Sequence, residues 1–112
     1  MEIIGQYVPW EPPHEINNFG SQFWYKQYSV ALHREDGPAV IFKNGHTEWY
    51  KEGSLHREDG PAIIRTNGDK YWYIHNEDIT FEVIQWAEHC NIDLDNMSES
   101  EKLLLKIFIN GL

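Results

Sequence analysis

Residues 55–62 read LHREDGPA, and residues 32–39 read the same eight letters in the same order. The exact recurrence after 23 residues identifies two copies of one unit, because eight identical residues in a row do not recur by chance. Aligning residues 32–54 with residues 55–77 gives 13 identical positions. The chain is therefore predicted to be a repeat protein, and this octapeptide marks the start of each full copy.

Each unit is predicted to be a β-hairpin. In the first full copy, residues 39–43 are rich in β-branched and aromatic side chains, Asn44-Gly45 follows, and residues 47–50 supply the return strand. Asn-Gly is typical of a type I′ turn, which needs a positive φ at both central residues. Asn67-Gly68 holds the same place in the second copy. We expect an antiparallel meander of five or six strands, with the octapeptide as the turn that resets each hairpin.

A half-copy precedes the two full copies. Trp24 and Tyr25 lead to Leu32 with two more residues than the full copies have, which predicts a bulge or a longer turn. In every copy the Trp-Tyr pair must point to opposite faces, because side chains alternate along a strand. The Trp row, which we expect in the core, is Trp24, Trp49 and Trp72. The Tyr row, which we expect on the other face, is Tyr25, Tyr50 and Tyr73.

The pattern HREDGPA…NG…WY…G at this spacing resembles the MORN-type repeat, in the variant form found in bacterial and phage-encoded proteins. The resemblance covers residues 18–79, and Asn76 departs from it by replacing the final glycine. It implies a hairpin-repeat sheet used for protein interaction or assembly, sometimes linked to membrane lipids, and it does not imply an enzyme. The small acidic format also resembles, more weakly, accessory proteins of phages, which implies residence in the host cytoplasm.

The last third of the chain changes to a helical pattern. Thr80 is predicted to cap a helix over residues 81–89. Residues 98–101 form a capping box that begins a second helix, ending near residues 110–111. The second helix is apolar nearly all round, so we expect it to be covered on more than one side. Either the sheet and the first helix cover it, or a second subunit does so in a homodimer. The expected buried side of the first helix comprises Phe81, Ile84 and Ala87.

These features predict an α+β fold in a single domain. It comprises an N-terminal arm (residues 1–17), the hairpin repeats (18–79) and a helical cap (80–112). Three prolines among residues 9–13 favour an extended arm. We expect the arm to lie across the sheet as an edge segment docked through Trp10, with a free recognition arm as the alternative.

The composition narrows the class of partner. The net charge of −9 argues against direct binding to a nucleic acid, which needs clustered Lys and Arg, and favours a protein with a basic surface. No apolar run approaches the roughly 18 residues of a membrane span. The single cysteine, Cys90, excludes an internal disulfide and fits a reducing cytoplasm. We expect Cys90 to be a small core residue.

Acidic residues dominate the region from Tyr71 to Glu101, which has eight carboxylates and no Lys or Arg. One interpretation is a solvated helical face. The functional interpretation is a contact surface for a basic partner, such as a nucleic-acid-handling host protein that the chain would inhibit. The residues assigned to partner binding are Tyr25, Tyr50, Tyr73, Glu77, Asp78, Glu82, Glu88, Asp93 and Asp95.

The octapeptide also suggests acid–base or metal chemistry, but its geometry opposes both. His33 and His56 should lie two strands apart, roughly 10 Å, which is too far for one metal ion. A turn is needed in every copy, whereas a catalytic group is needed once. We therefore expect Asp36 and Asp59 to cap the Gly-Pro turn and the arginines Arg34 and Arg57 to pair with carboxylates. His89 and Cys90 are adjacent on a helix and do not face each other.

The sequence thus predicts no catalytic residue, metal or cofactor. The leading hypothesis is a non-enzymatic protein-interaction module. The alternative is a structural or assembly protein that self-associates through the last helix. An enzyme would require a cleft that joins His33 or His56 to carboxylates from elsewhere in the chain.

Overall fold

The computed structural model describes residues 11–112, and in this range ten short strands precede two helices. The predicted α+β fold, an antiparallel meander followed by two C-terminal helices, is confirmed. The strands are more numerous than expected because each predicted return strand is interrupted at its tryptophan, Trp49 or Trp72. The elements are β1 (Glu15–Ile16), β2 (Gln22–Phe23), β3 (Val40–Ile41), β4 (Thr47–Glu48), β5 (Tyr50–Lys51), β6 (Ser54–Leu55), β7 (Ile63–Ile64), β8 (Lys70–Tyr71), β9 (Tyr73–Ile74), β10 (Glu77–Asp78), α1 (Thr80–Cys90) and α2 (Glu99–Asn110).

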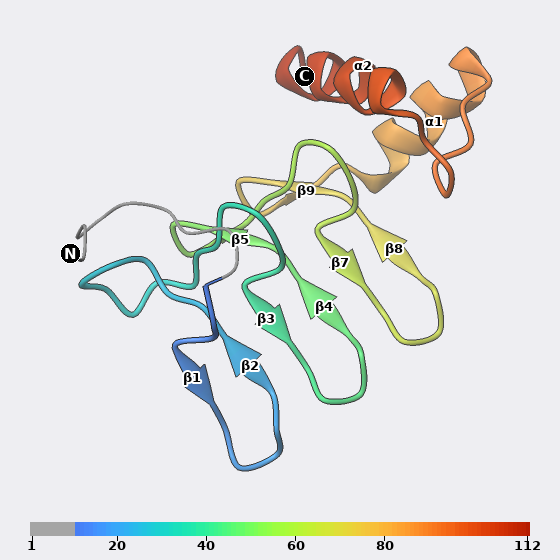
Figure 1. Ribbon diagram of the computed structural model, residues 1–112. Helices are drawn as coiled ribbons and strands as arrows, with labels where there is room; N and C mark the ends of the chain where they lie inside the picture. The colour runs from blue at the N-terminus through green and yellow to red at the C-terminus, as the bar shows by residue number, and fades with distance from the viewer. Residues whose placement is uncertain (1–10) are drawn as a thin grey trace.

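Six of the strands form the larger sheet, in the order β1-β2-β3-β4-β7-β8, with every neighbouring pair antiparallel. Figure 1 shows its hairpins side by side, with their tips along one edge. Strand β4 of the first full copy pairs directly with β7 of the second, so that Thr47 lies opposite Ile64. Consecutive copies therefore extend one continuous surface.

A second ladder of hydrogen bonds runs beside the first. It contains the pairs β5–β6 and β9–β10. Backbone bonds join the start of each full copy to its end, from Gly53 N–H to the Leu32 carbonyl and from Asn76 N–H to the Leu55 carbonyl, each at 2.9 Å. Each full copy therefore contributes one hairpin to each ladder, and the chain passes between the ladders at its tryptophan.

The tight turns lie at different places from those expected. Glu52 and Gly53 have φ of 50° and 86°, so this two-residue loop is the one with the type I′ signature. The Asn-Gly turn has a positive φ only at Gly45, whose N–H donates to the Phe42 carbonyl. This longer loop is a type I turn followed by a left-handed glycine, because three residues rather than two separate Phe42 from its return partner His46. The octapeptide is not the resetting turn; it crosses from one ladder to the other.

The N-terminal side departs from the regular unit. The longer turn predicted after Tyr25 is present: Lys26 N–H donates to the Ala31 carbonyl, and Tyr28 has a positive φ of 58°. Strand β1 is the edge strand of the larger sheet, as expected for the arm. The predicted docking of Trp10 lies outside the described residues.

The Trp row is buried, although unequally. Trp24 and Trp72 are each 3% exposed, and Trp49 is half-buried. The Arg34 guanidinium lies 3.9 Å from the centre of the Trp24 ring, and the Arg57 guanidinium lies 3.7 Å from the Trp49 ring. Each octapeptide therefore places its arginine over the tryptophan of the preceding unit.

Glycine in the octapeptide makes room for this stacking. A Cβ at Gly60 would lie 2.7 Å from the guanidinium carbon of Arg57, and Gly37 is equally close to Arg34 at 2.8 Å. Any larger residue would push the guanidinium off the ring. The Arg57 Nη1 also donates to the carbonyl of Pro61 at 3.1 Å. The arginine is thus stacked on the indole ring and bonded to the backbone of its own loop, and we call it the arginine lid.

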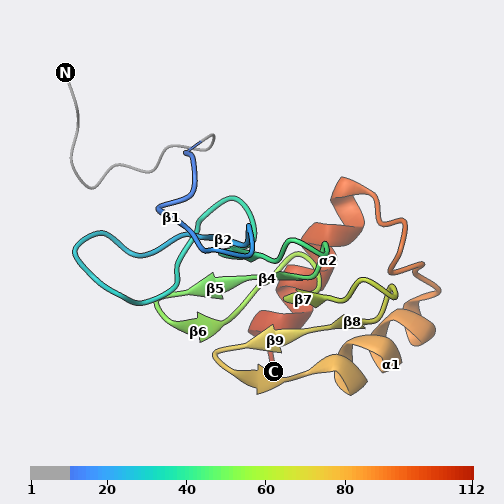
Figure 2. The ribbon, with the colours of Figure 1, turned by 90° about the horizontal axis from the view of Figure 1, so that it is seen from below.

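Trp72 has no such arginine and is covered by the helices instead. Figure 2 shows α1 and α2 beside the last strands of the array. The helix α1 begins at Thr80, one residue earlier than predicted, and the Thr80 hydroxyl accepts from Trp72 N–H at 3.0 Å rather than capping the helix. The apolar core around this tryptophan consists of Trp72, Ile79, Val83, Leu105 and Ile109.

The helices confirm the capping box and correct the predicted buried faces. The Ser98 hydroxyl accepts from Glu101 N–H, and the Glu101 carboxylate accepts from Ser98 N–H. In α1 the buried side chains are Val83 and Ala87, whereas Phe81 is exposed. Ala87 of the predicted stripe is buried as expected, but the buried side of α1 continues to Val83, four residues earlier, and not to Phe81. Ile84, the third residue of the predicted stripe, is also exposed.

Candidate functional site

The acidic residues predicted to bind a partner lie on the surface. Five of them make no salt bridge within residues 11–112 and are called the acidic surface here: Glu77, Asp78, Glu82, Glu88 and Asp93. Asp95 is the exception, because its Oδ1 lies 2.9 Å from Lys70 Nζ. The acidic surface spans β10, α1 and the loop after it, so this end of the molecule presents negative charge that is not neutralised by the described part of the chain.

An apolar stripe on α2 lies in the same cap. Leu103, Leu104 and Ile107 are exposed by 63%, 52% and 69% respectively, and we call them the α2 stripe. They lie on the opposite side of the helix from Leu105 and Ile109, which are buried against Trp72. The helix was expected to be covered on more than one side, but in residues 11–112 only one side is covered. The cap therefore combines apolar and acidic groups that are open to contact.

Tyr50 and Tyr73 of the Tyr row lie in β5 and β9 of the second ladder, and Tyr25 forms an isolated bridge with Leu32. All three tyrosines are half-buried. The Tyr50 hydroxyl donates to Glu48 at 2.9 Å, and burial together with this bond raises the pKa of Tyr50 to about 12. Tyr25 donates to Glu15, which raises its pKa. Tyr73 is the member that meets the acidic surface, because it pairs across the strands with Asp78. Burial, and then the Asp78 charge, raise the pKa of Tyr73.

The octapeptide histidines hold the second ladder together. His33 Nδ1 accepts from Glu52 N–H at 2.9 Å, while its Nε2 lies 2.7 Å from Glu35. The second copy repeats this arrangement: His56 Nδ1 accepts from His75 N–H at 3.2 Å. Each imidazole thus links the start of its own copy to the tight turn at the end of that copy. Both ring nitrogens of His33 therefore have partners within the repeat array.

His56 and the nearby arginine behave as structural groups. Burial, followed by the charge of His75, lowers the pKa of His56, whose Nε2 lies 3.6 Å from Glu58. The predicted pairing of Arg57 is confirmed, because its Nε donates to Asp59 Oδ1 at 2.9 Å. Asp59 therefore holds the arginine, and no bond from its side chain to the Gly-Pro backbone is present.

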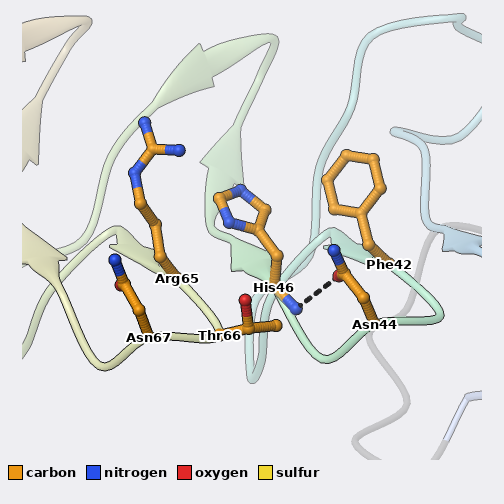
Figure 3. A pocket seen from close by; sticks show the side chains of 6 residues that line it. All are labelled: Phe42, Asn44, His46, Arg65, Thr66 and Asn67. Carbon is orange, nitrogen blue, oxygen red and sulfur yellow. Dashed lines mark hydrogen bonds between the residues drawn. The ribbon is translucent and has the colours of Figure 1, made fainter.

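A groove lies between the tips of two neighbouring hairpins, and Figure 3 shows its lining. Its volume is about 420 Å³, and its walls come from the β3–β4 turn and the β7–β8 turn. The lining residues are Phe42, Asn44, His46, Arg65, Thr66 and Asn67. Neither His33 nor His56 is among them, so this groove is not the cleft that the enzymatic hypothesis required.

Sequence reasoning missed this groove. It followed the positions that are identical in the two copies, and these positions build the frame. Phe42 and Arg65 occupy equivalent positions, as do His46 and Asp69, and both pairs differ between the copies. Positions that vary within an otherwise exact repeat are the signal that could have found it.

The remaining candidate chemistry is limited. Cys90 is exposed, which corrects the expectation of a core residue, because it ends α1 beyond the side that packs on Trp72. Within residues 11–112, no cluster of three or more His, Cys, Asp or Glu is arranged to hold a metal ion. No helix in that range has the length and apolar character needed to cross a membrane.

Comparison of the chain with protein-family models, with curated proteins and with solved structures finds no match.

Proposed function

We propose that this chain is a non-catalytic protein-interaction module of the host cytoplasm whose helical cap binds a protein with a basic surface. Its binding would inhibit that partner by covering the surface that the partner uses for another polyanion, such as a nucleic acid. The resemblance to MORN-type repeats of phage-encoded proteins agrees with this role. The observation that carries the proposal is that one helical cap holds both the acidic surface, which makes no salt bridge within residues 11–112, and the exposed α2 stripe.

The chemistry of the cap defines the partner. Exposed aliphatic side chains favour contact with another apolar surface, since burial contributes roughly 25 cal/mol per Å² of apolar area. Carboxylates on the same cap favour Lys and Arg on the partner and oppose acidic surfaces, including that of a second copy of this chain. The partner is therefore expected to present an apolar patch within a basic rim.

The repeat array supports a non-catalytic role. Its recurring polar groups bond to one another: His33 joins the turn at Glu52, and Arg57 covers Trp49. These are the groups that would otherwise be the first candidates for acid–base chemistry. The array thus works as a rigid frame that carries the cap.

Affinity capture from an extract of the native host tests this proposal. The variant Glu82→Gln/Glu88→Gln removes two charges from the exposed side of α1. A matched control, Asp36→Asn/Glu52→Gln, removes two exposed charges from the repeat array. We expect the first variant to lose at least tenfold in capture of the partner and the control to lose less than twofold. The captured protein should be basic, and added salt should release it.

Two outcomes contradict the proposal. Equal losses in the two variants would mean that only the net charge matters. Unchanged capture by Glu82→Gln/Glu88→Gln would show that the partner binds elsewhere on the molecule.

A second candidate function is self-association through α2, which the exposure of Leu103, Leu104 and Ile107 favours. Sedimentation velocity at micromolar concentration separates this from the first proposal. A dimer that is dispersed by Leu103→Gln/Ile107→Gln supports assembly. A monomer at every concentration up to about 100 μM rules it out.

A further inference from the structure

The register of the larger sheet places four side chains in a row near the hairpin tips. Phe42 N–H donates to the His46 carbonyl, and Arg65 N–H donates to the Asp69 carbonyl, so each of these pairs closes a hairpin. Thr47 lies opposite Ile64 in the pairing of β4 with β7, which places the preceding His46 beside Arg65. Figure 3 shows Phe42, His46 and Arg65 pointing to the same side.

His46 is held in a fixed orientation. Its Nε2 lies 2.7 Å from Glu48 Oε2, and the other oxygen of Glu48 accepts from the Tyr50 hydroxyl at 2.9 Å. The ring also packs edge-on against Phe42, with 5.1 Å between centroids, and the side chain is only 15% exposed. Glu48 and Phe42 thus fix the imidazole of His46 at one wall of the groove.

Arg65 differs from the two other arginines of the chain. Arg34 and Arg57 lie over tryptophans and donate to the carbonyls of their own turns. Arg65 is exposed, and its guanidinium carbon is 5.4 Å from the centre of the Tyr71 ring. The guanidinium makes no hydrogen bond or salt bridge within residues 11–112. The planar fork of donors is therefore open.

An open guanidinium beside amide and hydroxyl groups is suited to bind the oxygens of an anion. We propose that the groove between the hairpin tips binds an oxyanion, either a phosphate group or a carboxylate. Arg65 supplies a bidentate fork, and His46, held by Glu48, forms the wall of the groove next to it. The Asn44 amide and the Thr66 hydroxyl line the same groove and add neutral donors.

Asp69 tunes this site. It lies on the other side of Arg65 in the same row, but its Oδ2 accepts from the Asn67 amide at 3.1 Å, and it forms no salt bridge with Arg65. Its charge nevertheless opposes an incoming anion. Neutralising Asp69 should therefore strengthen anion binding, whereas neutralising Arg65 should weaken it. Surface residues with no role in binding would not give these two opposite effects.

The test is an NMR titration of the whole chain with inorganic phosphate and, separately, with acetate, at constant ionic strength. We expect saturable shifts confined to amides around residues 44–46 and 65–67. A stronger response to phosphate identifies a free phosphate or phosphoryl group as the natural source, and a stronger response to acetate identifies a carboxylate. Either result supports the site.

Variants make the test specific. Arg65→Gln should weaken binding at least tenfold, Arg65→Lys several-fold because the charge remains but the fork is lost, and Asp69→Asn should strengthen it several-fold. Lys51→Gln is the matched control, because Lys51 is exposed and lies on β5 in the other ladder. The proposal is overturned if shifts are linear and spread over the surface. It is also overturned if Arg65→Gln and Lys51→Gln weaken binding equally while the spectra show both variants folded.

Discussion

Two tryptophans at equivalent positions of this array are covered in different ways. Trp49 lies under the guanidinium of Arg57, whereas Trp72 lies within an apolar cluster supplied by α1 and α2. The residue that stands where the next arginine would recur is Thr80, the first residue of α1. The helical cap thus begins at the position where the lid would have been.

The backbone makes equivalent hydrogen bonds at Trp49 and Trp72. His56 N–H donates to the Trp49 carbonyl at 3.1 Å, and Ile79 N–H donates to the Trp72 carbonyl at 2.8 Å. Only the cover changes. A lid of one side chain suits an internal copy, which has neighbours on both sides, while the last copy needs a larger apolar cover because no further copy follows it. Consistent with that apolar cover, the Trp72 indole N–H is buried without a hydrogen-bond partner among the described residues.

The largest effect is expected from removing part of the helical cover. Leu105 is fully buried against Trp72, so Leu105→Ala should lower the free energy of unfolding by about 2–5 kcal/mol. Urea unfolding followed by tryptophan fluorescence measures this loss. The adjacent Leu104 is the control, because it is exposed, and Leu104→Ala should change stability by less than about 0.5 kcal/mol. Similar losses in the two variants would mean that α2 does not pack as described.

A smaller effect is expected at the arginine lid. Gly60→Ala should displace Arg57 from Trp49 and cost about 1–3 kcal/mol, because the new methyl group would overlap the guanidinium. The control is the same substitution in an Arg57→Ala background, where the clash is absent and the cost should fall to a few tenths of a kcal/mol. A double-mutant cycle gives this coupling directly. If the two substitutions are additive, the stacking does not hold the loop.

These two covers also mark how far sequence reasoning reached. The recurrence of the octapeptide and the Asn-Gly dipeptides was enough to predict hairpin repeats, and the Ser98–Glu101 box was enough to place the second helix. The break at each tryptophan was not predictable, since alternation along a strand assumes that the strand continues. The partner of Trp49 was not predictable either, because a repeat shows that Arg57 recurs but not what it covers.

The candidate site followed the same pattern. The acids of the cap could be expected at the surface from their number alone, and the five of the acidic surface are exposed without salt bridges. The exposure of the α2 stripe could not be predicted, because in a helix that is apolar nearly all round the sequence does not tell which side packs against the rest of the chain. Predicting the groove at Arg65 would have required the pairing of β4 with β7, and this register could not be read from the sequence.

The smallest effect is expected from pH. Burial, followed by His75, lowers the pKa of His56 below 6.5, while Glu58 opposes this shift and Lys51 adds to it. The unfolded chain therefore takes up a proton at a higher pH than the folded chain does. The stability that this group contributes is complete above about pH 6.5 and is lost as the pH falls through the lowered pKa.

The variant His56→Asn isolates this contribution, because its side-chain oxygen can accept from His75 N–H without titrating. We expect the wild-type chain to lose more stability than His56→Asn between pH 7 and pH 5, measured by urea unfolding at each pH. Parallel profiles for the two proteins would show that protonation of His56 is not coupled to folding.

The most direct test of the comparison is one NMR measurement of ring-current shifts in the wild-type protein. Because Arg34 and Arg57 lie over indole rings, their side-chain protons should be shifted strongly upfield, while those of Arg65 remain close to ordinary values. For Trp72 the upfield signals should instead be methyl groups of the helical cap, such as those of Leu105. Three arginines with similar, ordinary shifts would contradict the account, because the internal tryptophans would then have no arginine lid to compare with the cap.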